Sequence, residues 1–141
     1  MIWKNKPTID LLNDLSKQTA VEHLGISFTD VGDDYLEATM PVDHRTIQPA
    51  GILHGGASVV LAETLGSVAS SLCVDDFTKE LPVGIEINAN HVKSATSGLV
   101  TGRAYPIKIG NRLHIWNIEI KDKSNDLICV SRLTTTIIQR R

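Results

Sequence analysis

A single carboxylate lies in an otherwise uncharged stretch of the chain, and a pair of glycines precedes it. His54, Gly55 and Gly56 open a run that continues to Cys73, and Glu63 is the only charged residue in it. Burying an unpaired charge is expensive, so this carboxylate is expected to be protonated, paired or held ready for chemistry. The glycines precede a predicted helix, whose first backbone N–H groups can bind an oxyanion. A simpler interpretation is that they only turn the chain and that His54 is an ordinary loop histidine.

The spacing between the glycines and the carboxylate favours a site shared by two chains. Gly55 and Glu63 are eight residues apart, which is about 12 Å along a helix with an angular offset of about 80°. One carboxylate side chain would struggle to reach a carbonyl held at the start of its own helix. We therefore predict that Gly55 of one chain faces Glu63 of a second chain, with the helices antiparallel about a two-fold axis.

Ser67 follows Glu63 by one helical turn and lies on the same face. Its hydroxyl can hold a water molecule or hydrogen-bond the carboxylate, and the alternative is a packing role in a serine-rich helix. No GxSxG motif surrounds it, and no His and Asp are arranged with it. A serine nucleophile is therefore not expected.

Two polar segments with cations follow later in the chain. The first runs from Asn88 to Lys93 and contains Asn90 and His91, and the second contains Arg112. Together they are candidates for a rim that binds phosphate. The alternative is a solvated sheet edge, because charged strand ends are common and also block edge pairing.

Composition and motifs argue against several other classes of protein. The net charge of -2 leaves no excess of cations, so nucleic acid is not expected as a partner. The histidines show no HxxxH or HxH pair and no nucleotide-binding glycine motif is present, so neither a metal nor a cofactor is expected. Cys73 and Cys129 lack ligand-like spacing and are expected to be reduced core residues. No secretion signal is evident and Glu63 interrupts the longest apolar run, so we expect a cytoplasmic chain that does not span a membrane.

Hydrophobic periodicity predicts one α+β domain from the 141 residues. Thr8 precedes a short amphipathic pattern and is a candidate helix cap. From Ala57 the apolar or small residues recur at helical spacing, at positions 57, 60, 61, 64, 65, 68, 69 and 72. Strands are predicted at about 26–31, 35–42, 83–92, 98–109, 113–121 and 127–138. A helix so apolar must be covered, so we expect an antiparallel sheet of about six strands to wrap it.

The residues around the glycine pair also resemble a known family. The run from Gln48 to Ser58, which contains His54 and Gly55, together with Glu63 is similar to that of hotdog-fold acyl-CoA thioesterases of the phenylacetate-degradation type. The stretches LEATMPVD, LHGGASVVLAE, GSVAS, EINANHV and SRLTTTI look close to two groups within that family. One group hydrolyses 1,4-dihydroxy-2-naphthoyl-CoA, and the other clears misacylated carrier protein in enterobactin synthesis.

The resemblance implies a single hotdog domain over residues 1–141, a homodimer with two shared sites and commonly a homotetramer. The implied reaction is hydrolysis of an aromatic acyl-CoA without a cofactor. Its leading substrate is 1,4-dihydroxy-2-naphthoyl-CoA of menaquinone biosynthesis. Two alternatives stay open: proofreading of an acylated carrier protein, and a non-catalytic protein that binds acyl-CoA.

The resemblance also implies roles for individual residues. Glu63 would be the nucleophile or the general base, and the Gly55 N–H would polarise the thioester carbonyl. Gln48 and His54 would position the thioester, while Ser67 would assist the hydrolytic water. The positions that match those near the pantetheine and nucleotide of CoA are His91, Lys93 and Ser94.

Overall fold

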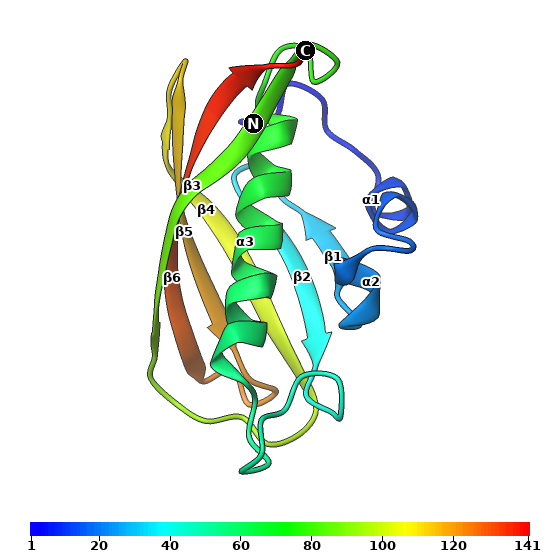
Figure 1. The fold of residues 1–141 in the computed structure, drawn as a ribbon, viewed down its shortest axis with the longest axis vertical. Helices are drawn as coiled ribbons and strands as arrows, with labels where there is room; N and C mark the ends of the chain where they lie inside the picture. Colours follow the sequence, from blue (N-terminus) through cyan, green and yellow to red (C-terminus); the bar gives the residue numbers. More distant parts are fainter.

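A curved antiparallel sheet packs against one long helix in the computed structural model, which describes residues 1–141 (Figure 1). The helices are α1 (Ile9–Leu15), α2 (Ala20–His23) and α3 (Gly55–Leu72). The strands are β1 (Ser27–Val31), β2 (Leu36–Pro41), β3 (Glu80–His91), β4 (Leu99–Ile109), β5 (Leu113–Lys121) and β6 (Leu127–Gln139). They form one sheet in the order β1-β2-β4-β5-β6-β3. The predicted α+β fold, with a long helix and six strands, is confirmed.

The leading helix α1 begins at the predicted cap and docks on β1. The hydroxyl of Thr8 accepts a hydrogen bond from the Leu11 N–H at 3.1 Å, which satisfies one of the free donors at the helix start. Leu12 is the buried residue of its apolar stripe. Asn13 holds the helix to β1, because its side chain accepts from the Phe28 N–H at 2.8 Å and donates to the Phe28 carbonyl at 3.1 Å.

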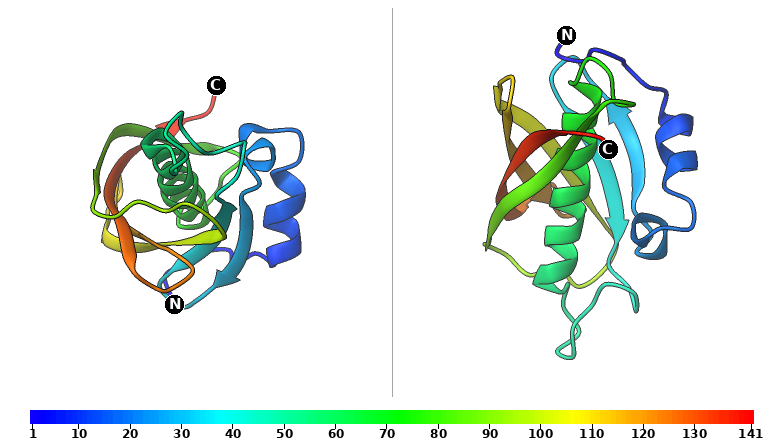
Figure 2. Two further views of the ribbon diagram at one scale, coloured as in Figure 1. Left: turned by 90° about the horizontal axis from the view of Figure 1, so that it is seen from below. Right: turned by 45° about the horizontal axis from the view of Figure 1, so that its top comes forward.

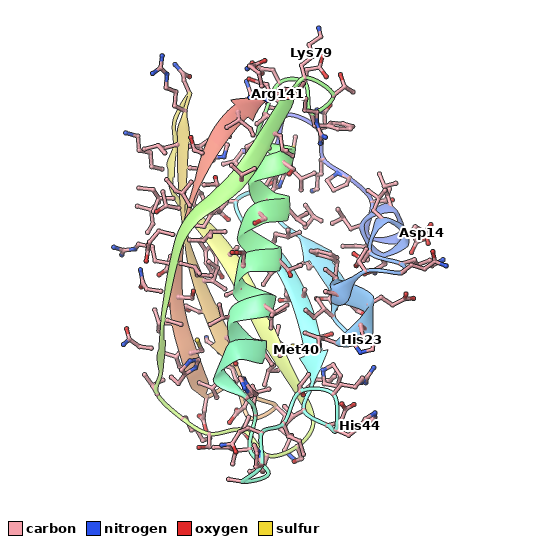
Figure 3. The ribbon with its side chains drawn as sticks, in the orientation of Figure 1. Asp14, His23, Met40, His44, Lys79 and Arg141 are labelled. Atoms are coloured by element: carbon pink, nitrogen blue, oxygen red, sulfur yellow. The ribbon has the colours of Figure 1, made fainter.

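Alternating burial along the strands builds the core between the sheet and α3. On β5, Trp116 and Ile120 are fully buried, and the residues between such positions are only half-buried. Met40 on β2 is fully buried as well, and side chains fill the space between sheet and helix (Figure 3). The helix approaches β4 closely at Gly102, where a β-carbon would stand 2.8 Å from Cδ1 of Leu65. A larger residue at Gly102 would therefore push the helix away from the sheet.

The buried side of α3 differs in part from the predicted stripe. Ala57 and Leu61 are buried as predicted, whereas Val60 and Val68 are half-buried. The reason is that the strands contact one side of the helix and curve around that side only (Figure 2). The remaining side, which carries Val60 and Val68, is half-buried in the single chain, and the half-buried Glu63 lies between this side and the edge of β3.

Strand β3 forms a long free edge of the sheet. It has 12 residues and pairs only with β6. Its register shifts between Gly84 and Glu86, so the edge bends there. Ile85 on this strand and Val92 just after it are each 57% exposed. A long edge with exposed apolar side chains is suited to contact another chain.

The cysteines are not reactive centres in this fold. Cys73 and Cys129 are both free and buried. Burial raises the pKa of Cys73 to about 11 and also raises the pKa of Cys129, so neither thiol ionises at neutral pH. The His, Cys, Asp and Glu side chains form no group of three or more that could hold a metal ion. None of the helices combines the length and the apolar character needed to cross a bilayer.

Candidate active site

The start of α3 leaves one backbone donor unused. His54 is the N-cap, and its Nδ1 accepts a hydrogen bond from the Gly56 N–H at 2.8 Å. The backbone N–H of His54 donates to the Thr46 carbonyl at 2.8 Å. The Gly55 N–H lies between these two bonded groups and has no acceptor within the chain. It is therefore free to donate to a ligand at the positive end of the helix dipole.

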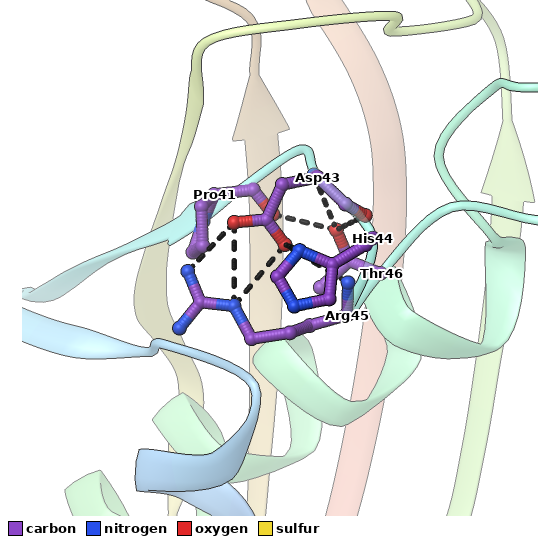
Figure 4. Close-up of polar contacts among 5 residues, drawn as sticks. All are labelled: Pro41, Asp43, His44, Arg45 and Thr46. Carbon is purple, nitrogen blue, oxygen red and sulfur yellow. Dashed lines mark hydrogen bonds and ion pairs between the residues drawn. The ribbon is translucent and has the colours of Figure 1, made fainter.

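An ordered loop brings the chain from β2 to the helix start (Figure 4). Arg45 donates to both carboxylate oxygens of Asp43, from Nη2 at 2.7 Å and from Nε at 3.1 Å. These hydrogen bonds hold the pKa of Asp43 at about 2. The buried hydroxyl of Thr46 donates to the Pro41 carbonyl at 2.6 Å and accepts from the Asp43 N–H. The loop is thus fixed just before Gln48.

Gln48 is anchored by three short-range bonds. Its backbone N–H donates to the Ile52 carbonyl at 2.9 Å, and its own carbonyl accepts from the Gly51 N–H at 2.8 Å. Its side-chain oxygen accepts from the Ala50 N–H at 2.5 Å. The side-chain amide nitrogen has no partner within the chain, so it can donate to a ligand.

A cavity of about 440 Å³ opens at the start of α3. Its lining comes from the loop before the helix, the first helical turn, the segment after β3 and the start of β6. The lining residues are Gln48, Ile52, Leu53, Gly55, Ser58, His91, Val92, Lys93, Ser94, Ala95 and Ile128. The structure thus brings together five of the predicted site residues: Gln48, Gly55, His91, Lys93 and Ser94.

The imidazole of His91 packs directly against Gly55. A β-carbon at Gly55 would stand 2.8 Å from Nε2 of His91 and 3.1 Å from its Cε1. Only a glycine leaves room for this ring beside the free N–H group. His91 therefore forms the wall of the cavity beside the start of α3.

Lys93, by contrast, is already engaged in ion pairs. Its Nζ lies 2.8 Å from Oδ2 of Asp122 and 2.6 Å from Oδ2 of Asp126. The hydrogen bonds to Asp122 and Asp126 raise the pKa of Lys93, and the same lysine lowers the pKa of Asp122. Lys93 therefore lines the cavity, but its positive charge is paired with two carboxylates of the same chain.

Glu63 and Ser67 line a different hollow. It measures about 550 Å³ and lies on the half-buried side of α3. Its lining residues are Val21, Val59, Val60, Glu63, Thr64, Ser67 and Val68. The carboxylate of Glu63 lies beside the free edge of β3, where its Oε1 would be 3.4 Å from a β-carbon on Gly84. It makes no ion pair. Within one chain, Glu63 therefore does not share the cavity of Gly55.

Three predicted site residues line neither hollow, namely His54, which caps α3, Asn90 and Arg112. Asn90 is exposed on β3, and Arg112 lies in the turn between β4 and β5. His91 is paired with Cys129 of β6, whereas Leu113 is paired with Thr136, seven residues further along the same strand. That separation is about 23 Å. The rim that was expected to combine Arg112 with Lys93 is therefore not formed within one chain.

Ser58 is a cavity residue that the sequence reasoning did not single out. It is 2% exposed and lines the cavity one helical turn after Gly55. Its hydroxyl makes no hydrogen bond to the protein, and it is not fully enclosed. Its position three residues after Gly55 could have indicated that it lines the same cavity, because residues with this spacing share a helix face.

Comparisons with known proteins agree with this fold. Residues 50–129 match the family model described as the thioesterase superfamily. A 1,4-dihydroxy-2-naphthoyl-CoA hydrolase of Escherichia coli is 55% identical over 138 residues, which cover 98% of this chain and 100% of that protein. A proofreading thioesterase of Cronobacter sakazakii is 50% identical over 98% of this chain and 99% of that protein.

Solved structures agree as well. The crystal structure of a Haemophilus influenzae thioesterase superposes with a TM-score of 0.95 at 52% identity, covering 99% of this chain and 96% of that one. A variant of a Pseudomonas aeruginosa thioesterase superposes with a TM-score of 0.97 at 44% identity, covering 99% of this chain and 100% of that one. The chain therefore belongs to the thioesterase superfamily and is a hotdog-fold hydrolase of thioesters.

Proposed function

We propose that this thioesterase hydrolyses an aromatic acyl-CoA at sites shared between two copies of the chain, with 1,4-dihydroxy-2-naphthoyl-CoA as the leading substrate. The observation that carries the shared site is the separation of its two halves. Gly55 and Gln48 offer unpaired donors in one cavity, while the unpaired carboxylate of Glu63 lines another. The 55% identity to a hydrolase of that naphthoyl-CoA supports the substrate.

The free edge of β3 supports a dimer that would join the two halves. Ile85 and Val92 expose apolar surface along this edge, and Glu63 lies beside it at Gly84. A second copy packed here with α3 antiparallel would bring Gly55 of one chain toward Glu63 of the other. The same contact would cover the half-buried valines around Glu63. Pairing of two such dimers into a homotetramer is part of the proposal.

In the proposed reaction the thioester carbonyl accepts a hydrogen bond from the Gly55 N–H. The helix dipole stabilises the negative charge that develops on that oxygen. The amide nitrogen of Gln48 is a second donor, and the imidazole of His91 limits where the thioester can lie. His54 contributes indirectly, because its Nδ1 caps the helix and holds the Gly55–Gly56 peptide in place.

Glu63 of the partner subunit then acts in one of two ways. As nucleophile, its carboxylate oxygen bonds to the carbonyl carbon, the C–S bond breaks and a mixed anhydride forms, which water hydrolyses. As general base, it takes a proton from a water molecule while the water oxygen bonds to that carbon. Ser67 lines the same hollow and is placed to hold the water. In both cases the products are the free acid and the thiol of CoA.

Mixed dimers test the shared site directly. One chain carries Glu63→Ala and the other carries Gln48→Ala, and each homodimer is expected to be nearly inactive. A hybrid has one site with intact Gln48, Gly55 and Glu63, so an equal mixture should recover about one quarter of the wild-type rate after random exchange. A mixture of Glu63→Ala with Glu63→Ala/Gln48→Ala chains is the control and should recover nothing. Hybrids that remain inactive would refute the shared site.

The close relatives also support an alternative substrate. The 50% identity to a proofreading thioesterase favours an acyl group carried on a carrier protein. Comparing kcat/KM for naphthoyl-CoA, benzoyl-CoA, a fatty acyl-CoA and an aroyl carrier protein separates the candidates. A kcat/KM highest for naphthoyl-CoA is expected, and a higher value for the carrier protein would assign the proofreading role. If the wild type releases no thiol from any of them, the remaining alternative is a non-catalytic acyl-CoA-binding protein.

A further inference from the structure

The ion pairs of Lys93 connect the cavity wall to a distant turn of the chain. Lys93 follows β3, whereas Asp122 and Asp126 belong to the turn between β5 and β6. The side chain of Asp122 is only 11% exposed, and those of Lys93 and Asp126 are 46% and 59% exposed. The ion pair with Asp122 is therefore shielded from solvent on the carboxylate side, whereas the ion pair with Asp126 is exposed.

The turn that holds Lys93 is itself well organised. Oδ1 of Asp122 accepts from the Ser124 N–H at 2.9 Å and from the Asp126 N–H at 3.0 Å. The Asp122 N–H donates to the Asp126 carbonyl at 2.9 Å. One carboxylate thus builds the turn with one oxygen and holds Lys93 with the other. An acceptor oriented this firmly is suited to fix the lysine in place.

The segment held by Lys93 is a wall of the cavity. Its first N–H, on Val92, donates to the Ile128 carbonyl at 2.8 Å, and the Ala95 carbonyl accepts from the Leu53 N–H at 2.8 Å. Between these two bonds, Lys93 makes the one side-chain tie, and Ser94 faces the cavity. Loss of the ion pairs would leave the wall held by these two bonds and by the longer bond of 3.5 Å from the Lys93 N–H to the Ile128 carbonyl.

The local charge argues against a free phosphate ligand at this lysine. Lys93 is the only Lys or Arg among the residues that line the cavity. Its two carboxylate partners give the three side chains a net charge of -1, from one cation and two anions. A phosphate would have to displace these carboxylates or approach them at close range, and like charges repel.

We infer that Lys93, held by Asp122 and Asp126, is a positioning residue for the cavity wall at residues 92–95 and not a ligand of the CoA phosphates. The inference rests on the proposed function, in which this cavity binds the thioester at the Gly55 N–H. It replaces the direct contact with CoA that the family resemblance implied for Lys93. The two roles predict opposite effects when the lysine is released from its carboxylates.

Kinetics with two thioesters of the same aroyl group distinguish the roles. One thioester is that of CoA, and the other is that of pantetheine, which lacks the nucleotide. Lys93→Met and Asp126→Asn should each raise KM about three- to tenfold for both thioesters with little change in kcat, as expected when binding is impaired and chemistry is not. Lys93→Arg should keep KM near the wild-type value, because it preserves the ion pairs.

The result that overturns the inference is specific to CoA. If Lys93 binds phosphate, Lys93→Met raises KM for the CoA thioester alone, and Asp126→Asn lowers it by freeing the cation. Asp126→Asn is a clean probe, because the only side-chain partner of Asp126 is Lys93. Asp34→Asn changes the same charge at an exposed position in the β1–β2 turn and should leave both KM values unchanged.

Amide hydrogen exchange tests the positioning role without any turnover. A peptide covering residues 92–95 should exchange about tenfold faster in Asp126→Asn than in the wild type, while peptides from α3 keep their protection. Unchanged exchange in both Asp126→Asn and Lys93→Met would refute the inference even if KM changes. If the wild type hydrolyses neither thioester, the proposed function fails and the exchange result still decides the role of Lys93.

Discussion

Nε2 of His91 lies 2.8 Å from the position that a β-carbon on Gly55 would occupy. The backbone of Gly55 does not adopt a positive φ, so conformational freedom is not the reason for glycine here. The reason is space, because the imidazole ring of His91 approaches this peptide too closely for a β-carbon. Gly55 and His91 thus form one packing unit, although they lie on different elements.

Replacing Gly55 with alanine tests this relationship. The added methyl group would displace the ring of His91 toward the cavity and obstruct the free N–H. We expect kcat/KM to fall about 100-fold, comparable to the loss of one oxyanion donor. Thermal unfolding should stay close to the wild type, because alanine is a better helix former than glycine. Adding His91→Ala to Gly55→Ala should recover part of the lost rate, and a further loss would show that the ring is not the obstacle.

Ser58 and Ser70 form a matched pair of buried serines on α3. The hydroxyl of Ser58 faces the cavity without a protein partner, whereas that of Ser70 bonds Thr135 at 2.9 Å and accepts from Trp116 Nε1 at 2.7 Å. Ser58→Ala should raise KM about five- to twentyfold with unchanged stability, because only a ligand contact is lost. Ser70→Ala should lower the free energy of unfolding by about 1–3 kcal/mol with unchanged KM. Steady-state kinetics and urea titration of both variants check the contrast.

Glu63→Gln tests the chemical role of the carboxylate. The amide has the same shape but is a poor nucleophile and base, so kcat should fall about 1000-fold or more while KM changes little. Because Glu63 makes no ion pair, the fold should tolerate the change. Variant activity within tenfold of the wild type would remove Glu63 from the mechanism.

A single turnover in labelled water separates the two mechanisms of Glu63. If the carboxylate attacks carbon, hydrolysis of the anhydride places label in its side chain whenever water attacks the glutamyl carbonyl. If it activates water, all label appears in the product acid. Mass spectrometry of the peptide that contains Glu63 makes the measurement.

Because His114 is buried, we expect the protein to lose stability in mild acid. This histidine is 2% exposed at the start of β5, and its Nδ1 has no partner. Burial lowers the pKa of His114 below its usual value of 6.5, so the unfolded chain binds the proton more readily than the folded chain. Neutral His114 therefore makes its full contribution to the free energy of unfolding above about pH 6.5. This contribution declines as the pH falls below that value, toward the pKa of the folded state. Urea titrations between pH 7.5 and about 5 should show this decline, smaller in His114→Phe and unaltered in His23→Gln, whose histidine is exposed.

Local patterns predicted α1, α3 and the six strands because these patterns depend on neighbours a few residues apart, whereas the four-residue helix α2 was not predicted. Thr8 before an apolar stripe predicted the cap of α1, and the run after Gly56 predicted α3. The start of β3 was placed too late, at Val83 in place of Glu80. The misleading signal is Pro82, which lacks an N–H donor but is tolerated because β3 is an edge strand.

The sequence alone also determined that Gly55 and Glu63 are too far apart on one helix to act on one carbonyl, since helix geometry converts their spacing into a distance. Only the tertiary structure decided which polar groups meet. His91 reaches Gly55 because β3 pairs with the far strand β6, and Lys93 meets Asp122 across 29 residues. The same strand register moves Arg112 to the opposite end of the sheet. Strand order and register depend on packing of the whole core, so no local pattern could have fixed these contacts.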